Sequence, residues 1–297
     1  MGCLHPLRAF PTGAYSDKGK PVYFVTSHRF AYATVDDFIK RGLPYKDLYV
    51  DHYIEIPCGK CVACRKHNQL SWAFRCLAES HEHKFNYFLT LTYDDAHLPE
   101  DLQKRDLQLF NKRLRKVAPF RFFACGEYGD INKRPHYHGL YFSDSELFPD
   151  MVPWAHKGSY NLYNSAVLSK IWPFGFSVIG CVSQSSCAYC AKYCLKASDP
   201  EPNKAKPFIL MSRAPGLGDA FFEANLSSSR LVQPTGEGRA LFGGLPRYVK
   251  EKHGISTVYD SSLEDFAKMR DLGLSDYEDF RWLEDYLLKH PALVSLR

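Results

Sequence analysis

The segment HYHGLYF, residues 136–142, decides the fold of this chain. Its aromatic and apolar residues predict a β-strand. Successive side chains of a strand point to opposite faces, so His136 and His138, two residues apart, point to one face and can share a metal ion. A second segment, FLTLTY at residues 88–93, alternates apolar and β-branched residues and predicts a half-buried strand. We therefore expect a β-sheet that carries a pair of imidazoles.

Further elements are predicted before and after these strands. Apolar residues at every third or fourth position predict a helix over residues 106–117. The residues that repeat are Leu107, Phe110, Leu114 and Val117. Residues 120–125 and 176–182 predict two more strands, and the polar residues 126–130 join the first of these to the strand at 136–142. A helix over residues 187–197 follows a run of serines, which are apt N-caps. These elements predict an α+β fold.

The two ends of the chain differ from this middle part. Residues 1–57 mix Gly, Pro and aromatic residues and predict short strands and turns. A Cys-rich stretch and a helix follow them. Pro200 and Pro202 mark a boundary, because the residue before a proline disfavours helix, and two helices separated by Gly273 are predicted after it. The expected parts are a Cys-rich segment with its helix at 1–80, a core at 81–200 and a helical extension at 201–297.

Composition sets the class of protein. With 45% hydrophobic and 24% charged residues, the chain can bury a sizeable core. It has no apolar run of 18 residues and no signal-peptide pattern, which predicts a soluble intracellular protein without a membrane segment. The charge of +5, with 19 Tyr and 21 Phe, suits a nucleic acid partner, although aromatic residues also fill cores. No phosphate-binding P-loop motif occurs, so helicase activity would have to come from another protein.

The imidazole pair has a candidate third ligand in Glu127, at the end of the preceding strand. Two imidazoles and a carboxylate leave coordination positions open, which suits Mg²⁺ or Mn²⁺ polarising a phosphate oxygen. Taken alone, a pair of histidines two residues apart is a weak indication, because many such pairs are incidental. The metal site therefore needs support from other residues.

That support comes from Tyr189 and Tyr193, which lie four residues apart on a predicted helix and present both phenols on one face. Lys192 and Lys196 each follow a tyrosine by three residues, so an ammonium group can favour the phenolate or hold a phosphate. A tyrosine with an ordinary pKa near 10 needs such help to attack a phosphodiester at neutral pH. The alternative is an aromatic stripe that packs on the sheet.

Taken together, these motifs resemble the replication initiators of the Microviridae, small phages with single-stranded DNA, and particularly the gokushovirus type. The shared motifs are FLTLTY at 88–93, GEYG at 126–129, RPHYHG at 134–139, YxxKYxxK at 189–196, PCGKC at 57–61, MSRxPG at 211–216 and PRY at 246–248. The resemblance covers roughly residues 3 to 250. It implies an HUH endonuclease, in which an antiparallel sheet flanked by helices carries the histidine pair.

The resemblance also implies a rolling-circle mechanism. One tyrosine attacks single-stranded or supercoiled origin DNA and keeps a 5′ phosphate, while the free 3′ hydroxyl serves a host polymerase; a host helicase is a further expected partner. The second tyrosine cuts the regenerated origin, and the strands are rejoined in the cytoplasm of a bacterial host. Two other functions stay open: an HUH transposase or relaxase, and a non-catalytic metal-containing protein that binds DNA.

Basic residues provide a candidate track for the DNA backbone, or else an ordinary solvated helix face. They are Lys112, Arg113, Arg115, Lys116, Lys133 and Arg134.

The ten cysteines fall into groups. Cys58, Cys61 and Cys64 are spaced for a metal, and Cys3 could complete a structural zinc site. An iron–sulfur cluster has overlapping spacing, and three loop thiols without metal are the remaining alternative. The cysteines near the tyrosine helix are expected to act as small hydrophobic residues. They are Cys181, Cys187, Cys190 and Cys194.

Overall fold

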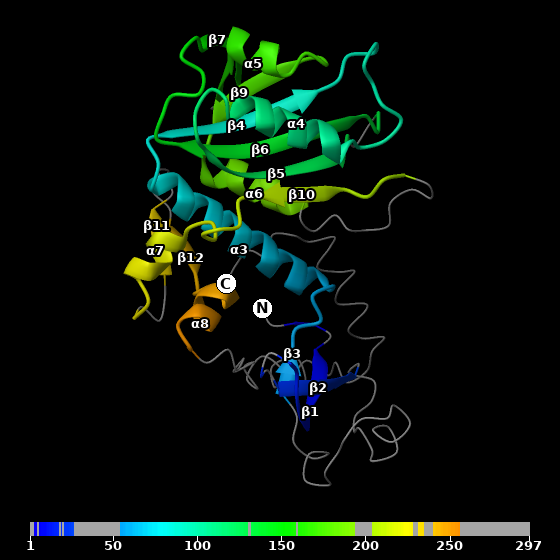
Figure 1. Ribbon diagram of the computed structural model, residues 1–297, viewed down its shortest axis with the longest axis vertical. Helices are drawn as coiled ribbons and strands as arrows, with labels where there is room; N and C mark the ends of the chain where they lie inside the picture. Colours follow the sequence, from blue (N-terminus) through cyan, green and yellow to red (C-terminus); the bar gives the residue numbers. More distant parts are fainter. Residues whose placement is uncertain are drawn as a thin grey trace. The chain divides into compact units, whose positions relative to one another are not determined.

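Among the described residues of the computed structural model, seven strands form one antiparallel sheet in the order β10-β5-β6-β4-β9-β8-β7. The strands are β4 (Phe85–Thr92), β5 (Arg121–Tyr128), β6 (Pro135–Ser143), β7 (Val152–Lys157), β8 (Tyr160–Asn164), β9 (Ser177–Cys181) and β10 (Phe208–Met211). Figure 1 shows β4, β5 and β6 as the long central strands. Each central strand has neighbours on both sides, which explains their largely apolar sequences.

The structure describes residues 3–4, 6–17, 19, 21–26, 54–129, 132–158, 160–193, 204–227, 231–234 and 240–255. The chain divides into two units, one made of Met1–His67 with Thr257–Arg297, and the other of Asn68–Ser256. Within the described ranges, we find no helix with the length and apolar character that a membrane crossing requires.

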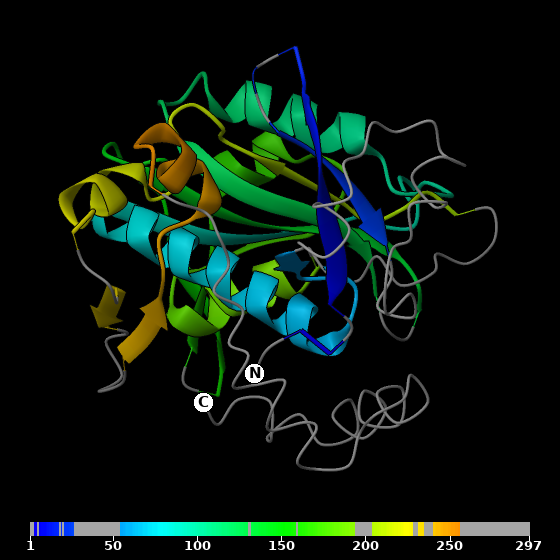
Figure 2. The same cartoon turned by 90° about the horizontal axis from the view of Figure 1, so that it is seen from below.

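Helices cover both faces of the large sheet. They are α3 (Val62–His81), α4 (Lys104–Leu114), α5 (Ala166–Ile171), α6 (Gln184–Tyr193), α7 (Asp219–Ala224) and α8 (Arg247–Lys252). Buried residues of α4 and α5 pack on one face, together with Tyr137 of β6. Buried residues of α3, α6, α7 and α8 pack on the other, together with Leu140 of β6. Figures 1 and 2 show α4 and α3 on opposite sides of the sheet.

The smaller unit contains a three-stranded antiparallel sheet in the order β2-β1-β3 among its described residues. Its strands are β1 (Leu7–Tyr15), β2 (Pro21–Thr26) and β3 (Ile54–Ile56). A small buried cluster in the same unit joins Leu4 to Cys61, Ala63 and Cys64. A separate hairpin of the larger unit pairs β11 (Leu231–Pro234) with β12 (Ala240–Gly243).

The predicted α+β class, with an antiparallel sheet and flanking helices, is confirmed. The strand predicted at residues 120–125 is longer in the structure, because residues 126–128 of the polar connection pair with residues 135–137 of β6 and continue β5, which agrees with the expected place of Glu127 at a strand end. Residues 152–171, for which no helix or strand was predicted, contain β7, β8 and α5. The helices predicted around Gly273 lie outside the described residues, and the three-part division stays a prediction.

A buried carboxylate joins several elements behind the sheet. Glu79 of α3 is 4% exposed. Its oxygens accept hydrogen bonds from the Arg121 side chain and from the backbone N–H of Gly218, at 2.6 Å in the latter case. The Arg121 guanidinium also donates to the carbonyls of Pro215 and Gly216. This network ties α3 and β5 to the segment before α7.

We expect Glu79→Ala to lower the free energy of unfolding by about 3–5 kcal/mol, because it leaves Arg121 and the Gly218 N–H without their carboxylate partner. Urea denaturation of both proteins measures the difference. Glu82→Ala is the matched control, since Glu82 is exposed, and should change stability by less than about 0.5 kcal/mol. Equal stability of the two variants would show that the network contributes little.

Candidate active site

Three potential metal ligands meet on the α3 and α6 face of the sheet. Glu127 of β5 pairs directly with His136 of β6, and the strand alternation brings His138 to the same face. The Oε1 atom of Glu127 is 3.1 Å from Nε2 of His136 and 3.3 Å from Nε2 of His138. Their candidate ligand atoms all lie within 4.8 Å of one another. We call these three residues the ligand cluster.

Burial and hydrogen bonding set the charge of the ligand cluster. Burial is the largest effect on Glu127 and raises its pKa, but the hydrogen bonds from His136 and His138 outweigh it, so the pKa falls below its ordinary value. Burial lowers the pKa of His138 more than the bond to Glu127 raises it. A carboxylate beside a neutral imidazole results, and these are the forms that bind metal ions.

The Nδ1 atom of each histidine makes a further contact that orients its imidazole ring. Nδ1 of His136 donates to the carbonyl of Arg134 at 3.1 Å, since a carbonyl only accepts. Nε2 of His136 therefore faces Glu127: it donates to the carboxylate when the ring is protonated, and it offers a lone pair to a cation when that proton is lost. Nδ1 of His138 is 3.0 Å from the hydroxyl of Thr90. An imidazole lone pair that faces a carboxylate is stabilised by a cation between them, so these residues fit a divalent metal.

Tyr189 lies beside the ligand cluster. Its hydroxyl is 3.4 Å from Nε2 of His138, and the two rings meet edge to face with centroids 5.0 Å apart. The ring of Phe88 stacks on His138 and meets Tyr189 at 81°. Tyr189 is 40% exposed, so a large substrate can reach its phenol.

The position of α6 follows from its cap and its buried side. The backbone N–H groups of Ser183 and Ser186 each donate to the other residue's hydroxyl, so α6 begins at Gln184, earlier than predicted. Gln69 of α3 donates to the carbonyl of Ala188 at 2.8 Å. Cys187 and Cys190 are buried in the core as small hydrophobic residues, as expected. Cys181, in contrast, is exposed, and Cys194 lies outside the described residues.

The described residues include only part of the predicted motif of two tyrosines and two lysines at 189–196. Lys192 is exposed on α6. The backbone of Tyr193 ends α6, but its side chain lies outside the described part, as does all of Lys196. The roles predicted for these three residues stay predictions.

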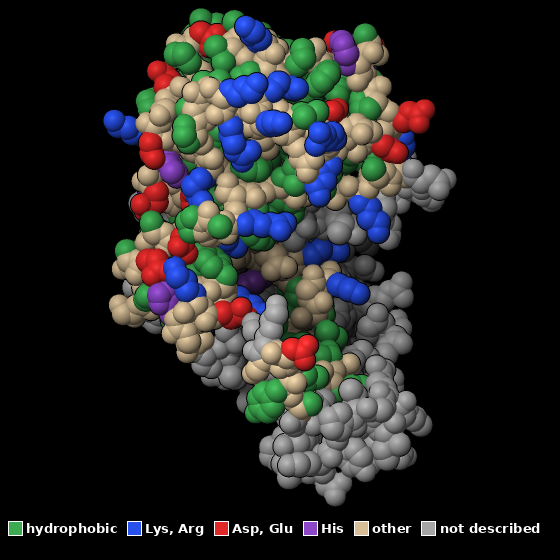
Figure 3. Space-filling model, in the orientation of Figure 1, with side chains coloured by type: hydrophobic (Ala, Val, Ile, Leu, Met, Phe, Trp, Pro, Cys, Tyr) green, Lys and Arg blue, Asp and Glu red, His purple; other side chains and the backbone are tan. Residues whose placement is uncertain are grey.

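The predicted basic track divides into two places. Lys112 and Arg113 lie on α4, with Arg115 and Lys116 directly after it. The buried side of α4 packs on the face opposite to the ligand cluster. Lys and Arg side chains gather over α4 in Figure 3. Two of the four have local partners: Arg113 donates to the carbonyl of Ile171, and Arg115 lies over the rings of Phe120 and Phe122. The structure therefore does not bring this group to the ligand cluster.

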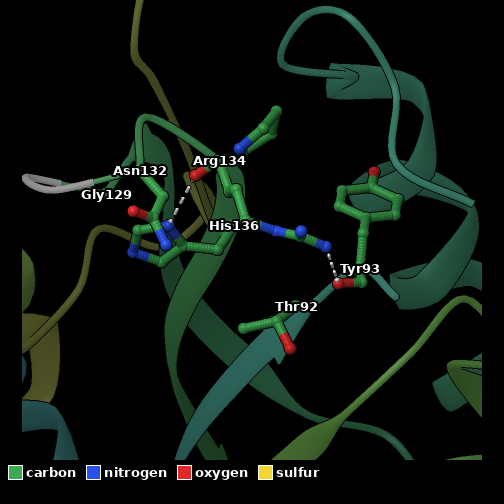
Figure 4. A pocket seen from close by; sticks show the side chains of 7 residues that line it. Thr92, Tyr93, Gly129, Asn132, Arg134 and His136 are labelled. Carbon is green, nitrogen blue, oxygen red and sulfur yellow. Dashed lines mark hydrogen bonds between the residues drawn. The ribbon is translucent and has the colours of Figure 1, made fainter. Parts of the chain in front are cut away.

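Lys133 and Arg134, by contrast, lie in the turn that precedes β6. A pocket of about 360 Å³ opens there, and His136 forms part of its wall (Figure 4). Its lining residues are Thr92, Tyr93, Gly129, Asn132, Arg134, Pro135 and His136. Figure 4 shows the guanidinium of Arg134 directed at the carbonyl of Tyr93, to which it donates at 3.0 Å. The same guanidinium pairs with Asp95, so a cation with local partners lies in the wall of the pocket that His136 also lines.

Sequence reasoning missed two residues that contact the histidines, Phe88 and Thr90. Both alternate onto the face of β4 that carries the site, and Thr90 pairs with His138 across the strands. The alternation in residues 88–93 could have indicated their face. Which strand lies next to β6 could not be read from that pattern.

Comparisons with known proteins agree on one kind of protein. The family model for replication-associated protein ORF2/G2P matches residues 86–198, which include the ligand cluster and Tyr189. Replication-associated protein VP4 of Bdellovibrio phage phiMH2K is 32% identical over 215 residues, which are 66% of this chain and 66% of that protein.

Two more phage proteins are similar. Replication-associated protein ORF2 of Spiroplasma virus 4 is 33% identical over 249 residues, 76% of this chain and 71% of that protein. Replication-associated protein ORF4 of Chlamydia phage 1 is 30% identical over 216 residues, but the match spans only 53% of its length. No solved structure matches this chain.

Proposed function

The chain belongs to the replication-associated proteins of the Microviridae, and on that premise we propose that it initiates rolling-circle replication by nicking and rejoining single-stranded origin DNA. The observation that carries this proposal is the phenol of Tyr189 at 3.4 Å from Nε2 of His138, beside a buried carboxylate and a second imidazole. A nucleophile next to a candidate metal centre suits metal-assisted cleavage of a phosphodiester. We assign the sheet with its histidine pair to the HUH endonuclease class.

Glu127, His136 and His138 would hold the metal ion, Mg²⁺ or Mn²⁺. When bound, such a cation polarises a phosphate oxygen and makes the phosphorus more electrophilic. Thr90 and the Arg134 carbonyl keep both imidazoles oriented through their Nδ1 atoms.

Tyr189 attacks the phosphorus in the first step. A bond forms between its phenolic oxygen and phosphorus, the bond from phosphorus to the 3′ oxygen breaks, and the phenolic proton passes to solvent. The departing 3′ oxygen takes up a proton and becomes a free hydroxyl. The protein keeps the 5′ phosphate as a tyrosyl ester. Because this ester conserves the energy of the phosphodiester, a 3′ hydroxyl can reverse the step and rejoin the strand without a nucleotide.

Tyr193 would make the second cut, because it follows Tyr189 by about one helical turn. Lys192 and Lys196 would favour the phenolates or hold the phosphate. Lys133 and Arg134 would contact the DNA backbone next to the pocket, and the basic residues of α4 would extend that contact over another face. A host polymerase and helicase would act on the nicked origin, in the cytoplasm of a bacterial host.

The test is a search for the covalent intermediate. Purified full-length protein is incubated with Mn²⁺ and labelled single-stranded fragments that tile the genome encoding it, and the products are separated on denaturing gels. We expect one fragment to yield a protein-linked label that EDTA abolishes. Label on element ends or a transfer origin would favour a transposase or relaxase. Intact DNA binding without an adduct on any fragment would leave a non-catalytic binding protein.

A further inference from the structure

Four cysteine sulfurs converge in the smaller unit, far in sequence from the residues of the proposed nicking reaction. Cys3 precedes β1, Cys58 and Cys61 follow β3, and Cys64 lies in the first turn of α3. Their Sγ atoms all lie within 4.8 Å of one another. We call these residues the cysteine cluster.

The distances between sulfurs match a single tetrahedral ion. The Sγ atoms of Cys3 and Cys61 are 3.9 Å apart, and so are those of Cys58 and Cys64. A tetrahedral ion with metal–sulfur bonds of about 2.3 Å separates its ligands by about 3.8 Å. A disulfide would bring two sulfurs to about 2.05 Å, and all four cysteines are free thiols.

Backbone N–H groups donate to the sulfurs of Cys3, Cys58 and Cys61. The N–H of Cys58 donates to Sγ of Cys3 at 3.2 Å, and the N–H of Cys61 donates to Sγ of Cys58 at 3.3 Å. The N–H of Leu4 and that of Cys64 both point at Sγ of Cys61. Gly59, with φ of +71°, permits the tight turn between the first two ligands after β3. N–H donors stabilise negative sulfur, so each of these bonds favours the thiolate form of its acceptor.

The distances between the sulfurs also distinguish a zinc ion from an iron–sulfur cluster, two alternatives that the cysteine spacing left open. An iron–sulfur cluster places a core of several atoms between its cysteines, whereas sulfurs this close to one another surround one ion. Thiolate sets in tetrahedral geometry are typical of Zn²⁺, and a site with four protein ligands is closed and structural. Such an ion would also link Cys3, ahead of β1, to the start of α3, where the buried apolar cluster is small.

We infer that Cys3, Cys58, Cys61 and Cys64 bind one structural Zn²⁺ that holds the smaller unit together. This site is independent of the proposed nicking reaction, because its ligands are separate from Glu127, His136 and His138.

Metal analysis and X-ray absorption of the full-length protein, purified with added zinc, test the inference. We expect about one tightly held zinc per chain with four sulfur neighbours. The double variant His136→Ala with His138→Ala should keep this zinc, which excludes the ligand cluster as its source. Cys58→Ser with Cys61→Ser should lose it, whereas Cys181→Ser, the matched control at an exposed cysteine outside the cluster, should keep it.

The X-ray absorption spectrum of the wild-type protein tests the inference even if a cysteine variant fails to fold. Zinc with nitrogen or oxygen neighbours, iron with labile sulfide, or no tightly held metal would each overturn the inference. Failure of the nicking assay would leave it untouched, because the metal measurements need no DNA.

Discussion

Replacing Tyr189 by phenylalanine should abolish the covalent adduct at this position and slow the first cut by at least ~10³-fold, as loss of a nucleophile typically does. The reason is the position of its phenol, 3.4 Å from His138. Phenylalanine lacks the oxygen that bonds to phosphorus but keeps the ring that meets Phe88, so α6 should stay packed. Single-turnover nicking of the origin fragment, with mass spectrometry of the labelled peptide, measures both effects.

Tyr160→Phe is the matched control, since Tyr160 is 41% exposed, close to the 40% of Tyr189, and lies on β8. It should nick at the wild-type rate. The companion variant Tyr193→Phe should still make the first adduct and fail in the second cut. If Tyr189→Phe nicks normally and Tyr193→Phe does not, the first attack belongs to Tyr193.

The second large effect concerns the ligand cluster. His138→Ala should weaken Mn²⁺ binding by more than ~100-fold, because a lost ligand costs more than the ~10–100-fold typical of a lost outer partner. Nicking should fall with it, since His138 also neighbours the phenol. Calorimetric titration of Mn²⁺ into the full-length protein gives the affinity, and the adduct assay gives the activity.

A milder variant distinguishes the effect of orienting the His138 ring from the effect of losing it as a metal ligand. Thr90→Val keeps the shape of the side chain but removes the hydroxyl at 3.0 Å from Nδ1 of His138. It should reduce Mn²⁺ affinity by ~10–100-fold and leave folding intact. His81→Ala, at an exposed histidine outside the ligand cluster, should leave the affinity unchanged. Unchanged Mn²⁺ affinity in His138→Ala would remove this residue from the metal site.

Much of the site could be predicted because its geometry is local. Side chains two apart on a strand share a face, so His136 and His138 were placed together by their spacing alone. The cysteine spacing at 58, 61 and 64 likewise brings thiols together within a few residues of chain. The resemblance of the motifs also indicated a phage replication protein, and the family comparisons confirm it.

Other features depend on which segments pack together. Glu127 lies opposite His136 only because β5 pairs with β6 in one particular register. The basic side of α4 was grouped with Lys133 and Arg134, but α4 packs on the opposite face of the sheet from the ligand cluster. The contact of Tyr189 with His138 depends on α6 packing across the sheet.

The sequence by itself therefore determined the types of the elements that carry the site, the shared face of the histidines and, through the resemblance of its motifs, the class of protein. Only the tertiary structure decided strand order, the register that brings Glu127 and Thr90 to the histidines, and the face on which each helix lies. The physical reason is that periodicity reports which side of an element is apolar, whereas the partner of that side is chosen by the packing of distant segments.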